Sequence, residues 1–283
     1  MLVTGKELLL DAQKKGYAVG AFNINNMEIV QAIIEAAEET NSPVILQASQ
    51  GAIKYAGIDY IAALGKTAAK NAKVPVALHL DHGTDFEQVM VCIRHGFTSV
   101  MIDGSRFPLE ENIAFTKRVV EIAKAVGVSV EAELGKISGT EDHITVNERE
   151  ATFTDPDEAV RFVDETGVDY LAIAVGTAHG VYKGEPKLDF DRIKAIRDKV
   201  KIPLVLHGSS GVPAEALKKA ISLGIHKINI DTDLRIAFAE GVKNYVKENP
   251  DAIDPRKILA PAKAMMKEKI KEKMEIFGSV NKA

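Results

Sequence analysis

Three histidines, His82, His179 and His207, each follow a short apolar run that is typical of a buried strand. Three neutral imidazoles on one side of a fold suit Zn²⁺ and leave a fourth coordination position for a substrate. Asp81 stands directly before His82, so one strand end carries both a carboxylate and an imidazole. Such an end indicates a functional site, because each buried polar group needs a partner. The alternative for each histidine is a local hydrogen bond without a metal.

The other four histidines are expected to lie outside the ligand set. His79 is a rival ligand, but strand alternation predicts that it faces the same side as Asp81 and away from His82. The remaining three stand in a helical pattern, in a polar loop and before a strand, and they are His95, His143 and His226.

A glycine-serine turn offers a second kind of chemistry. Gly208, Ser209 and Ser210 follow an apolar run and lead into a helical pattern near Pro213. Backbone N–H groups and hydroxyls in such a turn form a cradle for an anion, and residues 229–232 are expected to form the neighbouring wall. A plain turn is the alternative. Lys183 is a candidate for neutralising a phosphate, although a single lysine is usually only solvated.

Eight strand-like segments that alternate with helical patterns must position these groups. The predicted strands are Ala18–Phe22, Pro43–Ala48, Val74–Leu80, Ser99–Ile102, Val128–Leu134, Tyr170–Val175, Ile202–Leu206 and Lys227–Ile230. The alternation, without a linker, predicts an α/β fold: a single-domain (β/α)₈ TIM barrel over residues 1–283, with its active site at the carboxyl ends of the strands. A doubly wound sheet is the alternative, but it usually has a glycine-rich turn where this chain has Asn23–Asn26.

The predicted helices include one with a capping box at Thr4 and one capped by Asp155. Other helical patterns are Met27–Thr40, Asp59–Asn71, Phe86–His95, Glu110–Val126, Asp191–Val200, Ala214–Leu223 and Asp233–Glu248. From Pro261 an apolar stripe of Met266, Ile270 and Met274 predicts an additional C-terminal helix that packs on the barrel or on a second subunit. Residues 135–154 form the longest non-helical gap, which is typical of a functional lid or a disordered segment.

Composition excludes several function classes. The chain has 283 residues and a net charge of −4, so it has no general attraction to nucleic acid or to anionic membranes. It has neither a signal-peptide pattern nor an apolar run of about 18 residues that would span a bilayer. The single cysteine, Cys92, cannot form an internal disulfide and is expected to be a small buried residue. These features predict a cytoplasmic protein.

The ordered set of motifs resembles the class II, metal-dependent fructose-bisphosphate aldolases. The matching stretches run through nearly the whole chain and are Gly20–Asn23, Pro43–Ser49, Leu78–Gly83, Glu133–Gly135, Gly176–Gly180, Leu206–Gly211 and Asn229–Thr232. The resemblance implies a catalytic zinc on the three histidines and an alternative or second metal position on Asp103 and Glu133. It also implies a monovalent cation, Na⁺ or K⁺, near one phosphate.

The resemblance also assigns roles in substrate binding and proton transfer. Asp81 corresponds to the general acid/base. The residues that correspond to contacts with dihydroxyacetone phosphate are Gly180, Gly208, Ser209, Ser210, Asn229, Ile230, Asp231 and Thr232. Asn23 is a further substrate contact, and Ser49 corresponds to the aldehyde-phosphate end. Glu141 is a candidate for proton transfer at C3, with a solvated loop acid as the alternative. Arg256 is a candidate for reaching the substrate phosphate of a neighbouring subunit in a homodimer or homotetramer.

The implied reaction is the reversible cleavage of fructose 1,6-bisphosphate in glycolysis and gluconeogenesis. Tagatose 1,6-bisphosphate, which differs only at C4, is the closest alternative substrate. A Schiff-base aldolase needs a lysine on an inner strand, often the sixth, and Leu171–Val175 has none. A metal-dependent barrel hydrolase usually has a His-x-His pair on the first strand, where this chain has Asn23–Asn25. A non-catalytic sugar-phosphate binder is the remaining alternative.

Overall fold

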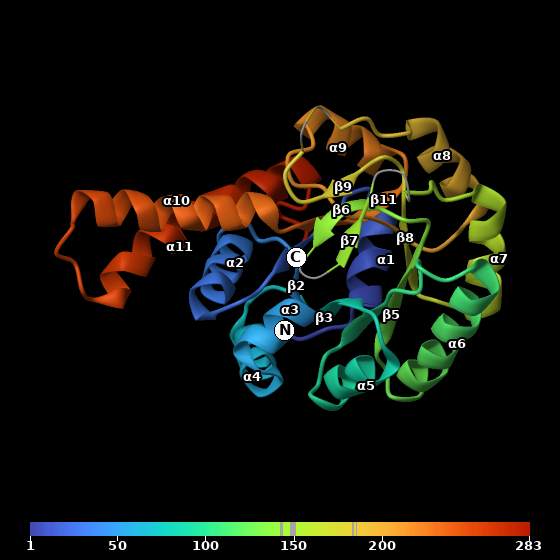
Figure 1. Ribbon diagram of the computed structural model, residues 1–283, viewed down its shortest axis with the longest axis horizontal. Coiled ribbons are helices and arrows are strands. Elements are labelled where there is room, and N and C mark those ends of the chain that lie inside the picture. The colour runs from blue at the N-terminus through green and yellow to red at the C-terminus, as the bar shows by residue number, and fades with distance from the viewer. Residues whose placement is uncertain (142–143, 148–150, 183, 185) are drawn as a thin grey trace.

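Eight parallel strands close into a barrel in the computed structural model, which describes residues 1–141, 144–147, 151–182, 184 and 186–283 (Figure 1). The barrel strands are β1 Val19–Asn23, β2 Val44–Ser49, β3 Val76–Gly83, β4 Ser99–Ile102, β5 Ser129–Leu134, β8 Tyr170–Ile173, β10 Leu204–Leu206 and β11 Ile225–Ile230. They pair in the order β1-β11-β10-β8-β5-β4-β3-β2. The predicted (β/α)₈ barrel is confirmed, and the doubly wound sheet is wrong.

Helices surround the barrel and bury the outer faces of its strands. They are α1 Gly5–Lys15, α2 Met27–Glu39, α3 Gln50–Ala56, α4 Ile58–Asn71, α5 Phe86–Arg94, α6 Leu109–Ala125, α7 Pro156–Thr166, α8 Phe190–Lys199, α9 Ala214–Ser222, α10 Thr232–Glu248 and α11 Pro255–Phe277. The capping box at Thr4 and the cap at Asp155 both form, which explains why these two starts were readable from the sequence. The short helix α3 was not predicted.

Helix α1 closes the amino-terminal end of the barrel. Leu8, Leu9 and Ala12 pack on barrel side chains such as Val19 and Tyr170. Gly5 lies so close to the Tyr170 hydroxyl that a Cβ at this position would collide with it. The barrel is therefore filled from below by α1, and its upper end is left for polar groups.

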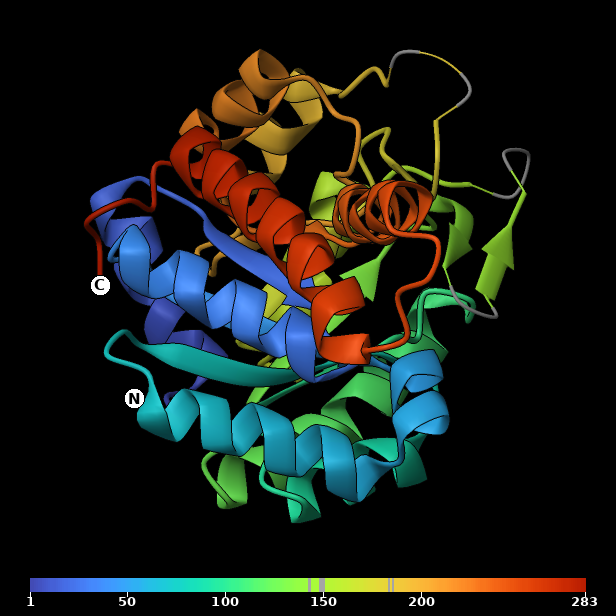
Figure 2. The same ribbon diagram turned by 90° about the vertical axis from the view of Figure 1, so that its left-hand side faces the viewer.

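The C-terminal helix is longer than expected. Helix α11 begins at Pro255, because Asp254 caps it and proline fits the first turn, and it continues through Pro261. The predicted stripe is buried: Met266, Ile270 and Met274 belong to the main core. Figure 2 shows α11 beside α2, and in Figure 1 the hairpin of α10 and α11 projects beyond the barrel.

The gap predicted after the fifth strand holds a small sheet. Strands β6 Ser138–Glu141 and β7 Ile144–Val146 are antiparallel, and β6 also pairs with β9 Ala178–His179. Within the described residues, no helix is long and apolar enough to cross a membrane. Cys92 is buried, and burial raises the pKa of its thiol to about 12, in line with a packing role.

We predict that Leu9→Ala destabilises the protein by about 2–5 kcal/mol, because it leaves a cavity between α1 and the barrel floor. Leu9 is 0% exposed, whereas its neighbour Leu10 is 45% exposed. Leu10→Ala is the matched control and should change the free energy of unfolding by no more than about 0.5 kcal/mol. Denaturant unfolding measures both, and equal effects would contradict the role of α1.

Candidate active site and metal centre

The end of β3 departs from regular strand geometry. Neighbouring residues of a regular strand face opposite sides. His82, however, has a left-handed φ of 45°, and the pairing of β3 with β4 shifts in register between Leu80 and Gly83. The prediction that His82 faces away from His79 is therefore wrong, since His79, Asp81 and His82 all make contacts inside the barrel. A left-handed non-glycine residue costs about 1–2 kcal/mol. That strain lets one strand end deliver a carboxylate and an imidazole to the same place.

The three predicted histidines converge. Ring nitrogens of His82, His179 and His207 all lie within 4.8 Å of one another. The ring centroid of His82 is 4.7 Å from that of His207 and 5.2 Å from that of His179. Nε2 of His82 lies 2.9 Å from Nδ1 of His207, close to the spacing of about 3.3 Å that two imidazoles need on a tetrahedral zinc. The donor set fits a zinc ion.

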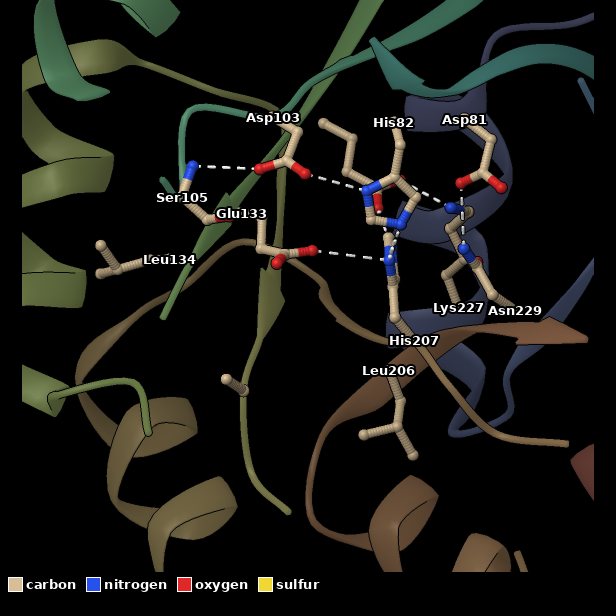
Figure 3. A network of polar contacts seen from close by, with 12 residues as sticks. Asp81, His82, Asp103, Ser105, Glu133, Leu134, Leu206, His207, Lys227 and Asn229 are labelled. Atoms are coloured by element: carbon tan, nitrogen blue, oxygen red, sulfur yellow. Dashed lines mark hydrogen bonds and ion pairs between the residues drawn. The ribbon is translucent and has the colours of Figure 1, made fainter. Parts of the chain in front are cut away.

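Carboxylates decide which nitrogen of two of these rings faces inward. Nδ1 of His82 lies 3.0 Å from Oδ2 of Asp103 (Figure 3). Nε2 of His207 lies 2.7 Å from Oε1 of Glu131. A neutral imidazole has one N–H, and a carboxylate accepts that hydrogen. In this tautomer the other nitrogen of each ring carries the lone pair that a metal ion needs. Burial lowers the pKa of His207, which favours the neutral ring.

Asp103 is held in place from its other side. Burial by itself would raise the pKa of Asp103, but hydrogen bonds from His82 and Ser105 outweigh burial and hold this pKa below its usual range. One ligand atom each of His82, Asp103 and Glu133 lies within 4.8 Å of the others. The structure thus brings together the two carboxylates that were predicted as a second metal position.

Asp81 is buried among amide groups. Its carboxylate accepts hydrogen bonds from Asn23 at 3.1 Å, Gln47 at 3.1 Å and Asn229 at 3.3 Å. These donors come from three different barrel strands, so the carboxylate is fixed beside His82. Sequence reasoning missed Gln47, although a single polar residue inside the apolar run Val44–Ala48 was a usable signal.

A small polar cleft of about 50 Å³ opens at this end of the barrel. Most of the predicted substrate-binding residues line it. The lining is Asn23, Thr140, His179, Gly180, Gly208, Ser209, Ser210, Asn229, Asp231, Thr232 and Arg235. The first turn of α10 and the glycine-serine turn supply backbone N–H groups, which favour an anion. Arg235 was not predicted; it lies one turn into α10 and pairs with Asp231 at 2.7 Å.

Other predicted residues lie apart from the cleft. The side chain of Ile230 is buried in the core, so any substrate contact from it is limited to its backbone. The hydroxyl of Ser49 accepts from the N–H of Ala52 and caps α3. Arg256 pairs with Asp254, and its side chain is 89% exposed near the start of α11. The backbone of Glu141 ends β6, and Lys183 lies outside the described residues.

Tyr182 connects the two loops that carry His179 and His207. Its hydroxyl accepts from the N–H of Ala178 at 2.7 Å and donates to the carbonyl of Gly208 at 2.7 Å. Gly208 has a φ of 59°, and a Cβ there would lie 2.5 Å from the carbonyl oxygen of Ala178. The loops can approach this closely only with glycine at this position.

Comparison with known proteins agrees with this site. The family model for class-II fructose-bisphosphate aldolase matches residues 3–282. The chain belongs to the class-II fructose-bisphosphate aldolase family. It is therefore an aldolase, a lyase that acts on carbon–carbon bonds, and the hydrolase, Schiff-base and binding-protein alternatives are wrong.

Relatives of this aldolase match it over its whole length. A fructose-bisphosphate aldolase from Thermus caldophilus is 52% identical over 100% of both chains. A sulfofructosephosphate aldolase from Alkalicoccus urumqiensis is 49% identical over 99% of this chain and 98% of its own. Among solved structures, the YdjI aldolase from Escherichia coli K12 is 40% identical, covers 100% of both chains and superposes with a TM-score of 0.89.

Proposed function

We propose that this aldolase uses zinc to cleave fructose 1,6-bisphosphate reversibly into dihydroxyacetone phosphate and glyceraldehyde 3-phosphate, in glycolysis and gluconeogenesis. The observation that carries the proposal is the convergence of three imidazoles within 4.8 Å, next to a buried aspartate and an anion-binding cleft. The identity of 52% to a fructose-bisphosphate aldolase supports the choice of substrate.

The proposed metal ligands are His82, His179 and His207, with Asp103 and Glu133 as an alternative or second position. A bound Zn²⁺ would supply Lewis acidity for the negative charge that develops on the ketose oxygens. Asp103 fixes the ring of His82 through its hydrogen bond at 3.0 Å. A monovalent cation, Na⁺ or K⁺, near one phosphate is part of the proposal.

Asp81 is the proposed general acid/base. In cleavage it takes the proton of the C4 hydroxyl, and in condensation it returns that proton to the C4 oxygen. The amides of Asn23, Gln47 and Asn229 orient the carboxylate for this transfer. Glu141 is proposed to transfer the proton at C3.

Local groups must hold the substrate phosphates, since the net charge of −4 gives no general attraction for anions. The backbone of residues 208–210, the first turn of α10 and Arg235 line one cleft and are proposed to bind the phosphate of dihydroxyacetone phosphate. Gly180, Asn229, Asp231 and Thr232 complete this wall. Ser49 is proposed for the aldehyde-phosphate end, and Lys183, which lies outside the described residues, is proposed to neutralise a phosphate.

We further propose a homodimer or homotetramer in which Arg256 reaches the substrate of a neighbouring subunit. Its side chain is 89% exposed near the start of α11, where its guanidinium pairs with Asp254 of the same chain. A cytoplasmic location, and the absence of nucleic-acid or membrane partners, stay predictions.

Turnover on three substrates tests the reaction. We expect the highest kcat/KM with fructose 1,6-bisphosphate, compared with tagatose 1,6-bisphosphate and with sulfofructosephosphate, the substrate named for the relative from Alkalicoccus urumqiensis. A coupled assay for dihydroxyacetone phosphate measures all three. A preference for either of the other two sugars would replace the proposed substrate but keep the aldolase chemistry.

Metal removal tests the zinc centre. Dialysis against a strong chelator should abolish turnover, because the negative charge that develops on the substrate loses its Lewis acid. Zn²⁺ added back after the chelator is removed should restore turnover. Full activity of the metal-free protein would refute the metal mechanism.

Replacement of the proposed base tests proton transfer. Asp81→Ala should lower kcat by about 10²–10⁴-fold, the usual size of an acid–base contribution, while the bound metal is retained. Metal content by elemental analysis is the control. Near-normal turnover in a metal-loaded Asp81→Ala protein would exclude Asp81 from this role.

A further inference from the structure

A fully buried ion pair lies in the barrel, and its lysine has no part in the chemistry described so far. Glu131 on β5 and Lys227 on β11 both have 0% of their side chains exposed. Nζ of Lys227 lies 2.7 Å from Oε2 of Glu131. Replacing such a pair with apolar side chains is often neutral or stabilising, since both ions lose their hydration. Stability alone therefore gives a weak reason for a lysine and a glutamate at this depth.

The pair is joined to a proposed metal ligand through Glu131. The two oxygens of this carboxylate divide the contacts: Oε1 lies 2.7 Å from Nε2 of His207, and Oε2 faces Lys227. His79 contacts the same Oε2 at 3.4 Å and is itself held by the Ser99 hydroxyl at 2.6 Å. Oε2 of Glu131 is thus fixed by Lys227 and His79, while Oε1 accepts from the ring of His207.

Lys227 is badly placed for covalent chemistry. A lysine that forms a Schiff base must be neutral and must meet the substrate carbonyl. The ammonium of Lys227 is paired with Glu131, has 0% exposure and does not line the cleft that holds the proposed substrate contacts. The ammonium contacts the carboxylate of Glu131 and the imidazole of His79, and both groups belong to the buried layer beneath the proposed ligands.

We propose that Lys227 and Glu131 act together as positioning residues that fix the tautomer and orientation of His207. With its Nε2–H donated to Glu131, the ring presents Nδ1 toward Nε2 of His82, 2.9 Å away. This inference rests on the proposed metal centre. The arrangement repeats the one at His82, where the backbone N–H of Ser105 holds Asp103 at 3.0 Å and Asp103 in turn holds the ring.

The test measures metal binding rather than turnover. Glu131→Gln and Lys227→Met should each weaken Zn²⁺ binding by about 10–100-fold, the usual effect of losing a partner of a metal-bound histidine, in competition with a chelator. The absorption spectrum of the Co²⁺-loaded protein should change in both variants, because the ligand field of His207 changes. The double variant should bind Zn²⁺ no more weakly than Glu131→Gln alone, because Lys227 acts through Glu131.

Two further variants separate positioning from general packing. Tyr17→Phe is the matched control: it removes the hydroxyl of a buried tyrosine, which donates to Asp11 and not to the residues that hold Glu131. It should leave Zn²⁺ affinity and the Co²⁺ spectrum unchanged. Glu131→Asp keeps a negative charge beside Lys227 but moves the carboxylate away from His207, so it should weaken Zn²⁺ binding. It remains a usable test if the neutral variants fail to fold.

The outcomes are distinguishable. Wild-type Zn²⁺ affinity and Co²⁺ spectrum in the Glu131 and Lys227 variants would overturn the positioning role alone. An equal loss in Tyr17→Phe would do the same, because the effect would then come from a general destabilisation of the barrel. If the wild-type protein binds no Zn²⁺, or if His179→Ala binds it equally well, the proposed metal centre fails and the positioning role fails with it.

Discussion

The proposed metal centre depends on one physical constraint: a neutral imidazole has a single N–H, and the site needs that hydrogen on the outer nitrogen. Asp103 accepts it from His82 and Glu131 accepts it from His207. Each carboxylate is buried, so each needs its own partner to remain an acceptor. The backbone N–H of Ser105 donates to Asp103, and the ammonium of Lys227 donates to Glu131. Many of the polar groups inside the barrel are therefore explained by the need of each ring for an acceptor and of each carboxylate for a donor.

The rest of the fold allows these linked hydrogen bonds to be buried inside the barrel. Helix α1 fills the lower end of the barrel with apolar side chains such as Leu8 and Leu9. The strained backbone of His82 then brings two consecutive residues, the proposed base and a proposed ligand, to the same place. Strain of this kind is tolerated where the surrounding contacts over-determine the conformation.

The barrel could be predicted because its signals are local. Alternating apolar runs and helix caps such as Thr4 and Asp155 are visible in short windows of sequence. The three histidines could be predicted because each follows an apolar run of the sequence, although His179 lies beyond the end of β8, on the short strand β9. The start of α11 at Pro255 was missed because Pro261 resembled a helix start, although a helix can accommodate it.

Glu131 and Lys227 were missed for a different physical reason. In the segments Ser129–Leu134 and Ile225–Ile230, polar and apolar residues alternate as they do in a strand with one solvated face. In a closed barrel that face is the interior, so the charges are buried. Glu131 shares its face with Glu133, and Lys227 shares its face with Asn229. A search for strand residues two positions from a predicted site residue finds both. No such signal existed for Arg235 or Tyr182, whose roles depend on tertiary contacts.

The position of His179 has a thermodynamic consequence. It lies on β9, which pairs with β6 outside the barrel, whereas His82 and His207 are attached to barrel strands. A small sheet with few strands opens at a lower free-energy cost than a closed barrel. An ion held by all three rings would bind only the closed arrangement and would add its binding free energy to the stability of that sheet. Amide hydrogen exchange in β6 and β9 would then report metal occupancy from a part of the chain that holds only one ligand.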